Sequence, residues 1–579
     1  MTSTVDPATR PAAVPTERRL PLRPGDFATL LDALDYASGA GTGASFHDGR
    51  GRLEASLDWG RIRQDAEQAG LRLAALGLAR GTRVGIVADT HPDFLVSFFA
   101  CRLAALVPVP LPASIHLGGH RHYVDLVGRL LAHAEARACL ASSAFAPYLA
   151  EADPQRALAF RGSLAELAAH DPAAALPERP APEELAYVQY TSGSTRFPRG
   201  AMLTERATLR NVRGIVEDGL AIREGDRFCS WLPIYHDMGL VGKVLVPMAS
   251  QTSIDYLGTR EFAMRPRLWP RLLTDQGGTI SFAPPFGYEL TARRLRPGDA
   301  ESFDLSAWRI AGCGADMIRP EVLERFAEAL APGGFDARAL TPSYGMAEVS
   351  LAVSFTPLGR GLEVDRIDVA RREREGEAVP VDADADRAAR FTVCGAPLPG
   401  YRVEIRDEAG AVLPERRVGS VFLDAPSTME GYLDPPGVDR SSLHEGWLDT
   451  GDLGYLTGGR LVITGRRKDL MIINGRNLWP QDVEFLTERR EGLRTGDAAA
   501  FTVEEEEGPV LVVLLQCREQ NEAARERLLR SVRSEVQAEF GVEARVVAVA
   551  PHSLPRTTSG KLSRAKARLD YLAGAFETP

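Results

Sequence analysis

The sequence predicts an α/β protein made of roughly three or four folding units. From Phe27 onward, amphipathic helical patterns alternate with short runs rich in β-branched residues, a rhythm typical of helices packed on a sheet. A chain of 579 residues is too long for one hydrophobic core, and its apolar content is sufficient for several. Short strands at 391–393, 402–406 and 419–423, separated by turn residues, indicate a small β-barrel subdomain.

The first elements follow this rhythm in order. The pattern predicts a helix over 62–76 that ends at Gly77, a strand over 83–87, a second helix over 123–134 and a strand over 138–141. The remaining expected elements are helices at 205–220 and 522–540, strands at 227–232, 278–283, 308–311 and 546–549, and a hairpin of 498–503 with 510–515.

Two other stretches need separate interpretation. The longest apolar stretch, 94–112, is interrupted by Arg102 and by three prolines, so we expect a buried helix leading into a strand and no membrane span. The polar stretch 151–174 is expected to be helical.

The composition limits the classes of partner and compartment. The formal net charge of −10 gives no basic surface over the whole chain for nucleic acid, although a local basic patch stays open. The six cysteines lie far apart without a CxxC pair, so we expect neither a zinc site nor a disulfide framework, and a reducing cytoplasm suits them. Residues 1–24 are rich in Pro, Thr and Arg, lack the apolar core of a signal peptide, and are expected to be a disordered tail.

A loop dense in hydroxyls and glycines, Thr191 to Gly200, follows an apolar strand at 185–188. Glycine lets the backbone approach an anion closely, while hydroxyls, backbone N–H groups and cationic side chains bind the anion's oxygens. A flexible linker is the alternative, but the apolar segments on both sides argue against it. The P-loop of nucleotide hydrolases is excluded, because Lys and Ser/Thr do not follow the last glycine. The candidate phosphate ligands are Thr191, Ser192, Gly193, Ser194, Thr195 and Arg196.

Three further segments place polar groups at strand ends. His236 beside an aspartate fits acid–base chemistry, although a structural histidine is at least as good an interpretation. The glycine-rich turn 312–316 lets an adenine ring approach flat, or is an ordinary turn. Tyr344 and Glu348 are suited to stack on a base and to hold Mg²⁺, or belong to an exposed turn.

Several of these motifs resemble one family of enzymes. The loop TSGSTRFPRG is similar to the signature TSGSTGxPKG of the adenylate-forming superfamily, which comprises acyl-CoA synthetases, luciferases and adenylation domains. Arg196 and the segment LPIYHDMGL at 232–240 are similar to one branch, the fatty acyl-AMP ligases. The resemblance implies that His236 borders the acyl carboxylate and the reactive phosphate. It also implies an acyl pocket lined by His236, Met238, Gly239 and Phe286.

The same resemblance assigns the nucleotide contacts. SYGMAE at 343–348 is similar to the superfamily's YGxTE motif, and TGDLGY at 450–455 to the segment whose aspartate accepts both ribose hydroxyls. PRTTSGKL at 555–562 is similar to the segment whose lysine enters the site from the small domain. Beyond the loop, the implied ATP contacts are Gly314, Ala315, Asp316, Ser343, Tyr344, Gly345, Met346, Asp452 and Arg466. The implied catalytic residues are Lys561, His236, Glu348 and Thr191, and Glu348 would hold Mg²⁺.

The resemblance covers nearly the whole chain and implies its domain plan. It places a large domain of two α/β subdomains plus the small β-barrel subdomain at 25–465, and a small mobile α+β domain at 466–579, with Lys468 as the hinge. Segment 355–390 has mixed charge and would be a surface loop or disordered by composition alone. By position it is similar to an insertion of many fatty acyl-AMP ligases that limits the swing of the small domain.

The function implied is that of an ATP- and Mg²⁺-dependent fatty acid:AMP ligase. It would make acyl-AMP and pyrophosphate and pass the acyl group to the phosphopantetheine thiol of an acyl carrier protein. No carrier domain is evident after Lys561, so the carrier is expected in trans. One alternative is a fatty acyl-CoA synthetase. An amino-acid adenylation domain is disfavoured, since nothing near His236 suggests an aspartate for an ammonium group. A non-catalytic adenylate-binding protein is disfavoured by the intact set of Glu348, Asp452 and Lys561.

Overall fold

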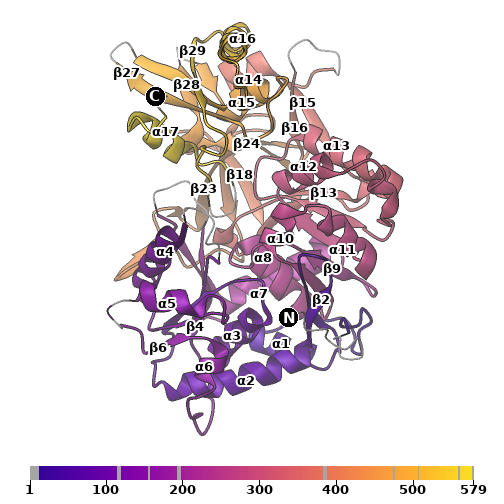
Figure 1. Cartoon of the computed structure of the whole chain (residues 1–579), viewed down its shortest axis with the longest axis vertical. Helices are drawn as coiled ribbons and strands as arrows, with labels where there is room; N and C mark the ends of the chain where they lie inside the picture. The colour runs from indigo at the N-terminus through magenta and orange to yellow at the C-terminus, as the bar shows by residue number, and fades with distance from the viewer. Residues whose placement is uncertain are drawn as a thin grey trace.

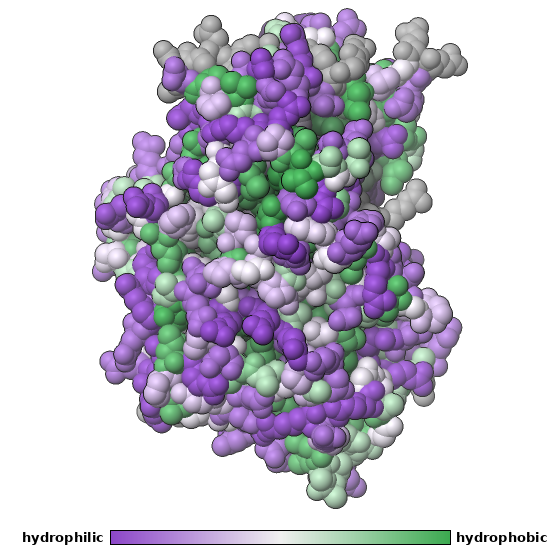
Figure 2. All heavy atoms as spheres, turned by 180° about the vertical axis from the view of Figure 1, so that it is seen from behind, coloured by the Kyte–Doolittle hydropathy of each residue, from purple (hydrophilic) through white to green (hydrophobic). Residues whose placement is uncertain are grey.

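The computed structural model describes residues 12–113, 119–153, 155, 157–191, 197–382, 388–473, 476–505, 508–557 and 561–576. Figure 1 shows a large lower body, which contains the N-terminus and most of the helices, and a smaller upper part, coloured orange to yellow, which contains the C-terminal elements. On the face seen in Figure 2, hydrophilic residues predominate and hydrophobic residues gather in small groups.

The main layer of the large body is a nine-stranded sheet. In spatial order its strands are β17 (Ala396–Pro397), β14 (Ala352–Phe355), β13 (Leu340–Gly345), β12 (Ile310–Cys313), β11 (Ile280–Ala283), β9 (Arg227–Ser230), β10 (Ser253–Leu257), β1 (Gly43–His47) and β2 (Leu53–Asp58). The strands from β13 to β1 run parallel, and antiparallel strands complete both edges. Parallel strands are covered on both faces, which explains why β9 to β12 are buried throughout.

Two four-stranded sheets also belong to the large body. One is wholly parallel, in the order β4 (Val107–Leu111), β3 (Arg83–Val87), β5 (Ala138–Leu140) and β6 (Phe160–Gly162). The other is antiparallel, in the order β21 (Gly437–Asp439), β20 (Tyr432–Asp434), β8 (Gly200–Thr204) and β7 (Leu185–Tyr190). The apolar stretch 94–112 is therefore a buried helix followed by a strand, as predicted.

Helices pack on these sheets and carry the connections between parallel strands. They are α1 (Leu30–Ala37), α2 (Trp59–Ala75), α3 (Pro92–Leu103), α4 (Gly119–His133), α5 (Ala146–Ala152), α6 (Leu164–Leu167), α7 (Glu205–Gly214), α8 (Asp237–Leu240), α9 (Val246–Ala249), α10 (Thr259–Met264), α11 (Leu268–Gln276), α12 (Pro285–Arg294) and α13 (Pro320–Leu330), with the π-helical turns η2 (Ile215–Gly219) and η3 (Val241–Leu245).

The polar stretch 151–174 is not the helix predicted for it. Its described residues, all but 154 and 156, hold only the end of α5, strand β6 and the single turn α6. The Ser163 hydroxyl accepts a hydrogen bond from the Glu166 N–H at 3.2 Å, and the Glu166 carboxylate accepts one from the Ser163 N–H at 2.7 Å. This capping box starts α6 at a fixed point, so the helix cannot extend back through the preceding residues.

A five-stranded antiparallel sheet forms the region where the sequence predicted a small barrel. Its strands are β18 (Arg402–Arg406), β19 (Gly419–Asp424), β22 (Leu443–His444), β23 (Trp447–Thr457) and β24 (Arg460–Arg466). Strand β23 lies between β19 and β24 and carries Asp452.

The described residues of segment 355–390, which are 355–382 and 388–390, form more regular structure than their composition suggests. The segment holds β15 (Val364–Asp368) and α14 (Val369–Glu375), and β15 pairs with β16 (Ala388–Thr392). Arg372 on α14 is 2 % exposed, so this charged segment buries part of its polar surface. Ile367 packs with Tyr455 and Val462 of the neighbouring sheet, which explains why the segment folds against the large body.

The C-terminal part has hydrophobic clusters separate from the main core. Its elements are β25 (Met471–Ile473), β26 (Arg476–Leu478), α15 (Pro480–Glu488), β27 (Ala498–Glu505), β28 (Gly508–Gln516), α16 (Glu522–Phe540), β29 (Ala544–Val549) and α17 (Arg564–Leu572). Strands β27 and β28 form the expected hairpin, and β29 pairs parallel to β28. The α+β character predicted for this part is confirmed.

The expected disordered tail is wrong for residues 12–24. Val14 is 7 % exposed, and its carbonyl accepts a hydrogen bond from Arg227 at 2.8 Å. Arg227 in turn pairs with the buried Asp255 at 2.6 Å. Composition did not reveal this segment because its partners are polar groups from β9 and β10, more than 200 residues away in the chain. Residues 1–11 lie outside the described part of the chain.

In the part of the chain that the structure describes, no helix combines the length and the apolar character needed to cross a bilayer.

Candidate active site

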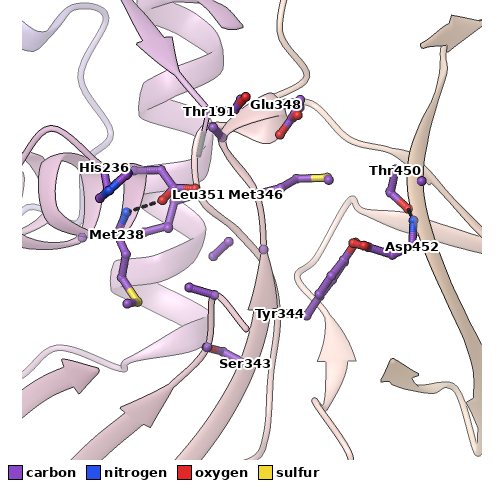
Figure 3. A pocket seen from close by; sticks show the side chains of 18 of the residues that line it. Thr191, His236, Met238, Ser343, Tyr344, Met346, Glu348, Leu351, Thr450 and Asp452 are labelled. Atoms are coloured by element: carbon purple, nitrogen blue, oxygen red, sulfur yellow. Dashed lines mark hydrogen bonds between the residues drawn. The ribbon is translucent and has the colours of Figure 1, made fainter. Parts of the chain in front are cut away.

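A cavity of about 430 Å³ lies where the large body meets the C-terminal part. Its walls come from the end of β7, the start of α8, the segment after β13, strand β23 and the residue Lys561. Figure 3 shows how these walls face one another: Thr191 and Glu348 lie together on one side, His236 and Met238 on a second, and Asp452 on a third. A smaller cavity of about 160 Å³ adjoins it and shares Tyr344, Arg466 and Lys561.

Most of the predicted site residues meet in these two cavities. Those that line the larger one are Thr191, His236, Met238, Gly314, Ala315, Ser343, Tyr344, Gly345, Met346, Glu348, Asp452, Arg466, Lys468 and Lys561. Asp316 lines the smaller one. Ser192, Gly193, Ser194, Thr195 and Arg196 lie outside the described residues.

Two residues assigned to the acyl pocket, Gly239 and Phe286, line neither cavity. Gly239 sits in a tight turn, where an added Cβ would lie 2.1 Å from the Pro233 carbonyl oxygen. Phe286 packs against the ring of Trp231, with centroids 5.8 Å apart. Gly239 therefore allows a close backbone approach and Phe286 packs beside the main core. Their place in the acyl pocket stays a prediction.

Tyr344 and Asp452 form one wall of the site. The Tyr344 hydroxyl donates a hydrogen bond to the Asp452 carboxylate at 2.6 Å, and the Arg466 guanidinium lies 3.5 Å from the same carboxylate. The Asp452 backbone N–H donates to the Thr450 hydroxyl at 3.0 Å, which fixes the turn that presents the carboxylate (Figure 3). Burial raises the pKa of Tyr344 well above its usual range, and the Asp452 charge adds to this. The tyrosine therefore stays neutral and presents a flat ring beside an ionised carboxylate.

Glu348 belongs to a second polar group of the cavity wall, on the side where Thr191 lies (Figure 3). Its carboxylate accepts a hydrogen bond from the Tyr432 hydroxyl at 2.5 Å. The guanidinium of Arg199 lies 3.4 Å from the centre of the Tyr432 ring and pairs with Asp439. Arg199 thus lines the cavity and already has a carboxylate partner.

His236 and Asp237 lie at the N-terminus of α8. The His236 carbonyl accepts from the Leu240 N–H at 2.7 Å, so the backbone turns sharply and both side chains reach the cavity. Burial raises the pKa of Asp237, and the nearby Lys561 opposes this shift. Sequence reasoning named Asp237 only as a neighbour of the histidine. Its position directly after a strand end was the signal that could have assigned it to the site.

Lys561 brings a charge from the end of the chain into this group of carboxylates. Burial lowers the pKa of its ammonium, and the Asp316 carboxylate opposes that shift. Asp237 and Asp452 also favour the charged form, whereas Arg466 disfavours it. A cation from the C-terminal part and carboxylates from the large body thus share one cavity.

The segment around Lys561 is held by Arg564, which sequence reasoning did not identify. Its guanidinium donates two hydrogen bonds to Glu484, both at 2.7 Å, and lies 3.2 Å from Asp469. The Thr557 N–H also donates to the Lys561 carbonyl at 2.7 Å. Bidentate arginine–carboxylate pairs fix geometry as well as charge, so Arg564 positions the lysine from one side of the smaller cavity.

One stretch of the wall of the larger cavity is apolar except for one residue. Ile215, Leu220, Phe282 and Phe355 line it together with Lys243. The sequence did show a lysine inside an apolar stretch, 238–249, but this signal was not used.

Comparison with known proteins places this chain in a family. Residues 46–433 match the family described as AMP-binding enzyme. The chain is 43 % identical over 564 residues to a putative acyl-CoA synthetase of Caulobacter vibrioides, which covers 97 % of this chain and 98 % of that protein. It is 30 % identical over 582 residues to a medium-chain-fatty-acid–acyl-carrier-protein ligase of Moorena producens, covering 95 % and 96 %.

A solved structure agrees with these matches. It comes from work on the fatty acyl-adenylate ligases of E. coli and L. pneumophila, and it superposes with a TM-score of 0.92 and 42 % identity over 96 % of this chain and 100 % of that one. The fold is that of an adenylate-forming enzyme. The chain belongs to the AMP-binding enzyme family and, within it, to the fatty acyl-AMP ligases.

Proposed function

We propose that this protein activates a fatty acid with ATP to acyl-AMP and pyrophosphate, and then transfers the acyl group to the phosphopantetheine thiol of an acyl carrier protein. The observation that carries the first step is the position of Lys561, which enters the same cavity as Tyr344, Glu348 and Asp452.

The nucleotide would lie along the wall formed by Tyr344 and Asp452. The neutral ring of Tyr344 offers a stacking face, and Asp452 offers a carboxylate that accepts both ribose hydroxyls. Gly314, Ala315 and Asp316 border the space left for the adenine. The phosphates would extend toward Thr191, on the side where Glu348 lies (Figure 3).

The first step joins two anions, so charge must be neutralised as they approach. A carboxylate oxygen of the acid forms a bond to the α-phosphorus, the bond from that phosphorus to the bridging oxygen breaks, and pyrophosphate leaves. Lys561 would hold the carboxylate and α-phosphate oxygens together, and this interaction strengthens as charge builds in the transition state. His236 would border the acid.

Glu348 is the residue that would hold Mg²⁺, which takes one or two carboxylates together with substrate phosphates. No cluster of three or more acidic, histidine or cysteine ligands occurs in the described ranges, and this fits an ion bound mainly by the nucleotide. When bound, the ion offsets the charge of the phosphates. Tyr432 fixes the orientation of the carboxylate through its hydrogen bond.

In the second step the carrier thiol attacks the acyl carbon. A thioester bond forms, the bond from the acyl carbon to the phosphate oxygen breaks, AMP leaves and the thiol proton passes to solvent. The name of the Moorena producens relative, a ligase that acts on an acyl carrier protein, supports this acceptor. An acyl-CoA synthetase remains the second candidate, supported by the name of the Caulobacter relative.

We also propose that the chain divides into 25–465 and 466–579, with Lys468 as the hinge. Lys468 lies in a short turn between β24 and β25 and lines the cavity, so a change in its backbone would move Lys561 relative to the nucleotide. Segment 355–390 would restrict this motion, because Arg372 contacts Asp482 at 2.5 Å.

All six cysteines are free, which supports a reducing cytoplasm as the compartment.

The decisive experiment supplies purified protein with ATP, Mg²⁺ and a panel of fatty acids and measures pyrophosphate release. Carrier protein or CoA is then added, and the thioester is identified by mass spectrometry. Acyl-AMP with transfer to the carrier only is the expected result. Acyl-CoA formation at a comparable rate would select the second candidate, and no pyrophosphate release with any acid would refute the proposed function.

A further inference from the structure

A buried lysine lies in the wall of the cavity beyond the reacting groups. Lys243 belongs to the π-helical turn η3, which continues α8, and only 1 % of its surface is exposed. The same cavity is lined around it by Ile215, Leu220, Phe282 and Phe355. Lysine is almost never fully buried unless a partner binds its ammonium.

The ammonium packs against two aromatic rings. It lies 4.3 Å from the centre of the Phe282 ring and 4.9 Å from that of Phe228. Among the described residues we find no carboxylate within 4.0 Å of it and no acceptor hydrogen-bonded to it. The Tyr256 hydroxyl bonds to the backbone carbonyl of Lys243 and leaves the ammonium untouched.

Lys243 is electrostatically separate from the group that surrounds Lys561. The groups that shift the pKa of Lys561 are Asp316, Arg466, Asp237 and Asp452. Burial lowers the pKa of Lys243, and the Cys229 thiol on β9 opposes this shift. The charged groups named for the two lysines do not overlap.

The position of Lys243 along the helix sets its distance from the groups that bind the reacting carboxylate. His236 precedes Lys243 by seven residues, which is about 10 Å along a helix axis. Because helical side chains lean toward the N-terminus, the ammonium points back toward the cavity. It is therefore placed to meet the far end of an acyl group whose carboxylate lies near His236 and Lys561.

Burying an ammonium without a partner is costly, and burying only one of two opposite charges costs more than burying both. We propose that Lys243 recognises an oxygen acceptor at the distal end of the acyl chain, and that the preferred substrate is a dicarboxylic acid activated at one end. This inference rests on the proposed function, because it concerns the substrate of the same reaction. An unsubstituted chain end would leave the ammonium buried and unpaired.

The test compares acids of equal length with different chain ends. Plain, ω-hydroxy and dicarboxylic acids are supplied to the wild type, and kcat/KM is measured from pyrophosphate release. We expect the dicarboxylic acid to exceed the plain acid by about 10- to 100-fold, as for other hydrogen bonds to a charged group, with the ω-hydroxy acid in between. A wild type that prefers plain acids at every length would overturn the inference.

Two variants show whether Lys243 is the cause. Lys243→Met keeps the volume and removes the charge, and should reverse the preference in favour of plain acids. Leu245→Met is the matched control, because Leu245 is buried in the same turn but does not line the cavity; it should keep the wild-type ratio. An unchanged ratio in Lys243→Met refutes the inference and leaves the proposed function intact, whereas a wild type inert toward every acid refutes the proposed function.

The ratio of the two kcat/KM values also has a predicted pH profile. Burial lowers the pKa of Lys243 to about 7, so the free enzyme loses this charge as the pH rises above neutrality. The dicarboxylic-to-plain ratio should therefore fall between pH 6 and about 8.5. Both substrates share the titrations of Asp237, Lys561, Cys229 and Tyr256, so these cancel in the ratio. Lys243→Met should give a flat profile, and a flat profile in the wild type would contradict the role assigned to Lys243.

Discussion

At the scale of single residues, the charge of Lys561 can be tested apart from nucleotide binding. Lys561→Ala should lower the rate of pyrophosphate release by about 100- to 1000-fold, because a cation that acts mainly in the transition state is lost. The affinity for ATP should change little, since Tyr344 and Asp452 hold the nucleoside. Equilibrium binding of ATP and single-turnover pyrophosphate release measure the two effects.

The matched control for Lys561 is Lys566→Ala. Lys566 lies in the same terminal segment, is 61 % exposed at its side chain, and pairs with Asp570 on the surface. It should retain the wild-type rate. Normal pyrophosphate release in Lys561→Ala would remove the residue from the mechanism.

A second residue, Lys243, should affect stability in a pH-dependent way. Its pKa falls from 10.5 to about 7 on burial, so between about pH 7 and pH 10.5 the unfolded chain binds a proton that the folded chain lacks. The wild type therefore loses stability as the pH falls from 10 to 7, and no further loss occurs below 7. Relative to wild type, Lys243→Met should gain roughly 4 kcal/mol in the free energy of unfolding at pH 7 and clearly less at pH 9.

Urea unfolding of wild type and Lys243→Met at the two pH values measures this difference. Leu245→Met serves again as the control and should show no pH-dependent gain. A variant that is less stable than wild type at pH 7 would show that the rings of Phe228 and Phe282 compensate the buried charge in full.

At the scale of elements, α14 joins the ordered part of segment 355–390 to the C-terminal part. The Arg372 guanidinium lies 2.5 Å from Asp482 and 4.2 Å from the Trp479 ring. Arg372→Met should weaken this contact by about 2 kcal/mol, which is roughly a 30-fold faster local opening. Amide hydrogen exchange of α14 and α15 measures it.

The neighbouring Arg371→Met provides the control for α14. Arg371 is 47 % exposed at its side chain and pairs with Glu375 and Glu377 within its own segment. Its loss should leave exchange in α15 unchanged. Equal effects of both substitutions would mean that the whole segment, and not the contact with Asp482, controls the opening.

The terminal element is anchored through α15 and α17. Arg564→Ala removes the bidentate pair with Glu484 and the contact with Asp469. We expect a fall of about 100-fold in pyrophosphate release, comparable to other small displacements of a reacting group. Arg568→Ala on the same helix is the control, and an undiminished rate in Arg564→Ala would show that Lys561 is held by other contacts.

The elements also show where sequence reasoning succeeds and where it stops. Motifs whose residues are adjacent in the chain, such as Tyr344 with Glu348, line one cavity as expected of one site. Gly239 and Phe286 do not line it, because a motif reports that a residue is close to the site but not which way it points. Arg564 was missed, since its role depends on Glu484, 80 residues away in the chain.

At the scale of the whole molecule, the site lies between parts with separate hydrophobic cores. A stable acyl-AMP analogue should contact both parts through Asp452 and Lys561. At 100 times its dissociation constant it should add about 2.7 kcal/mol to the free energy of unfolding. Calorimetry should show that both cores gain stability together.

The control for this prediction is Lys561→Ala, in which the analogue should stabilise chiefly the large body. Stabilisation confined to the large body in the wild type would mean that the C-terminal part does not close over the ligand. The α/β layers followed from the alternation of patterns along the chain, whereas the small α+β part was implied by the family resemblance. The packing of residues 12–24 followed from neither, because it depends on buried polar partners in distant strands.

The free thiols allow a label to be attached that follows the motion of the C-terminal part relative to the large body. Five cysteines are buried, and Cys517 alone among the six is partly accessible. Burial raises the pKa of Cys101 to about 12 and that of Cys394 likewise to about 12, so these thiols resist alkylation near neutral pH. A maleimide dye should therefore attach only at Cys517, just after β28. Its fluorescence should report rotation of the C-terminal part, and the buried cysteines need not be replaced first.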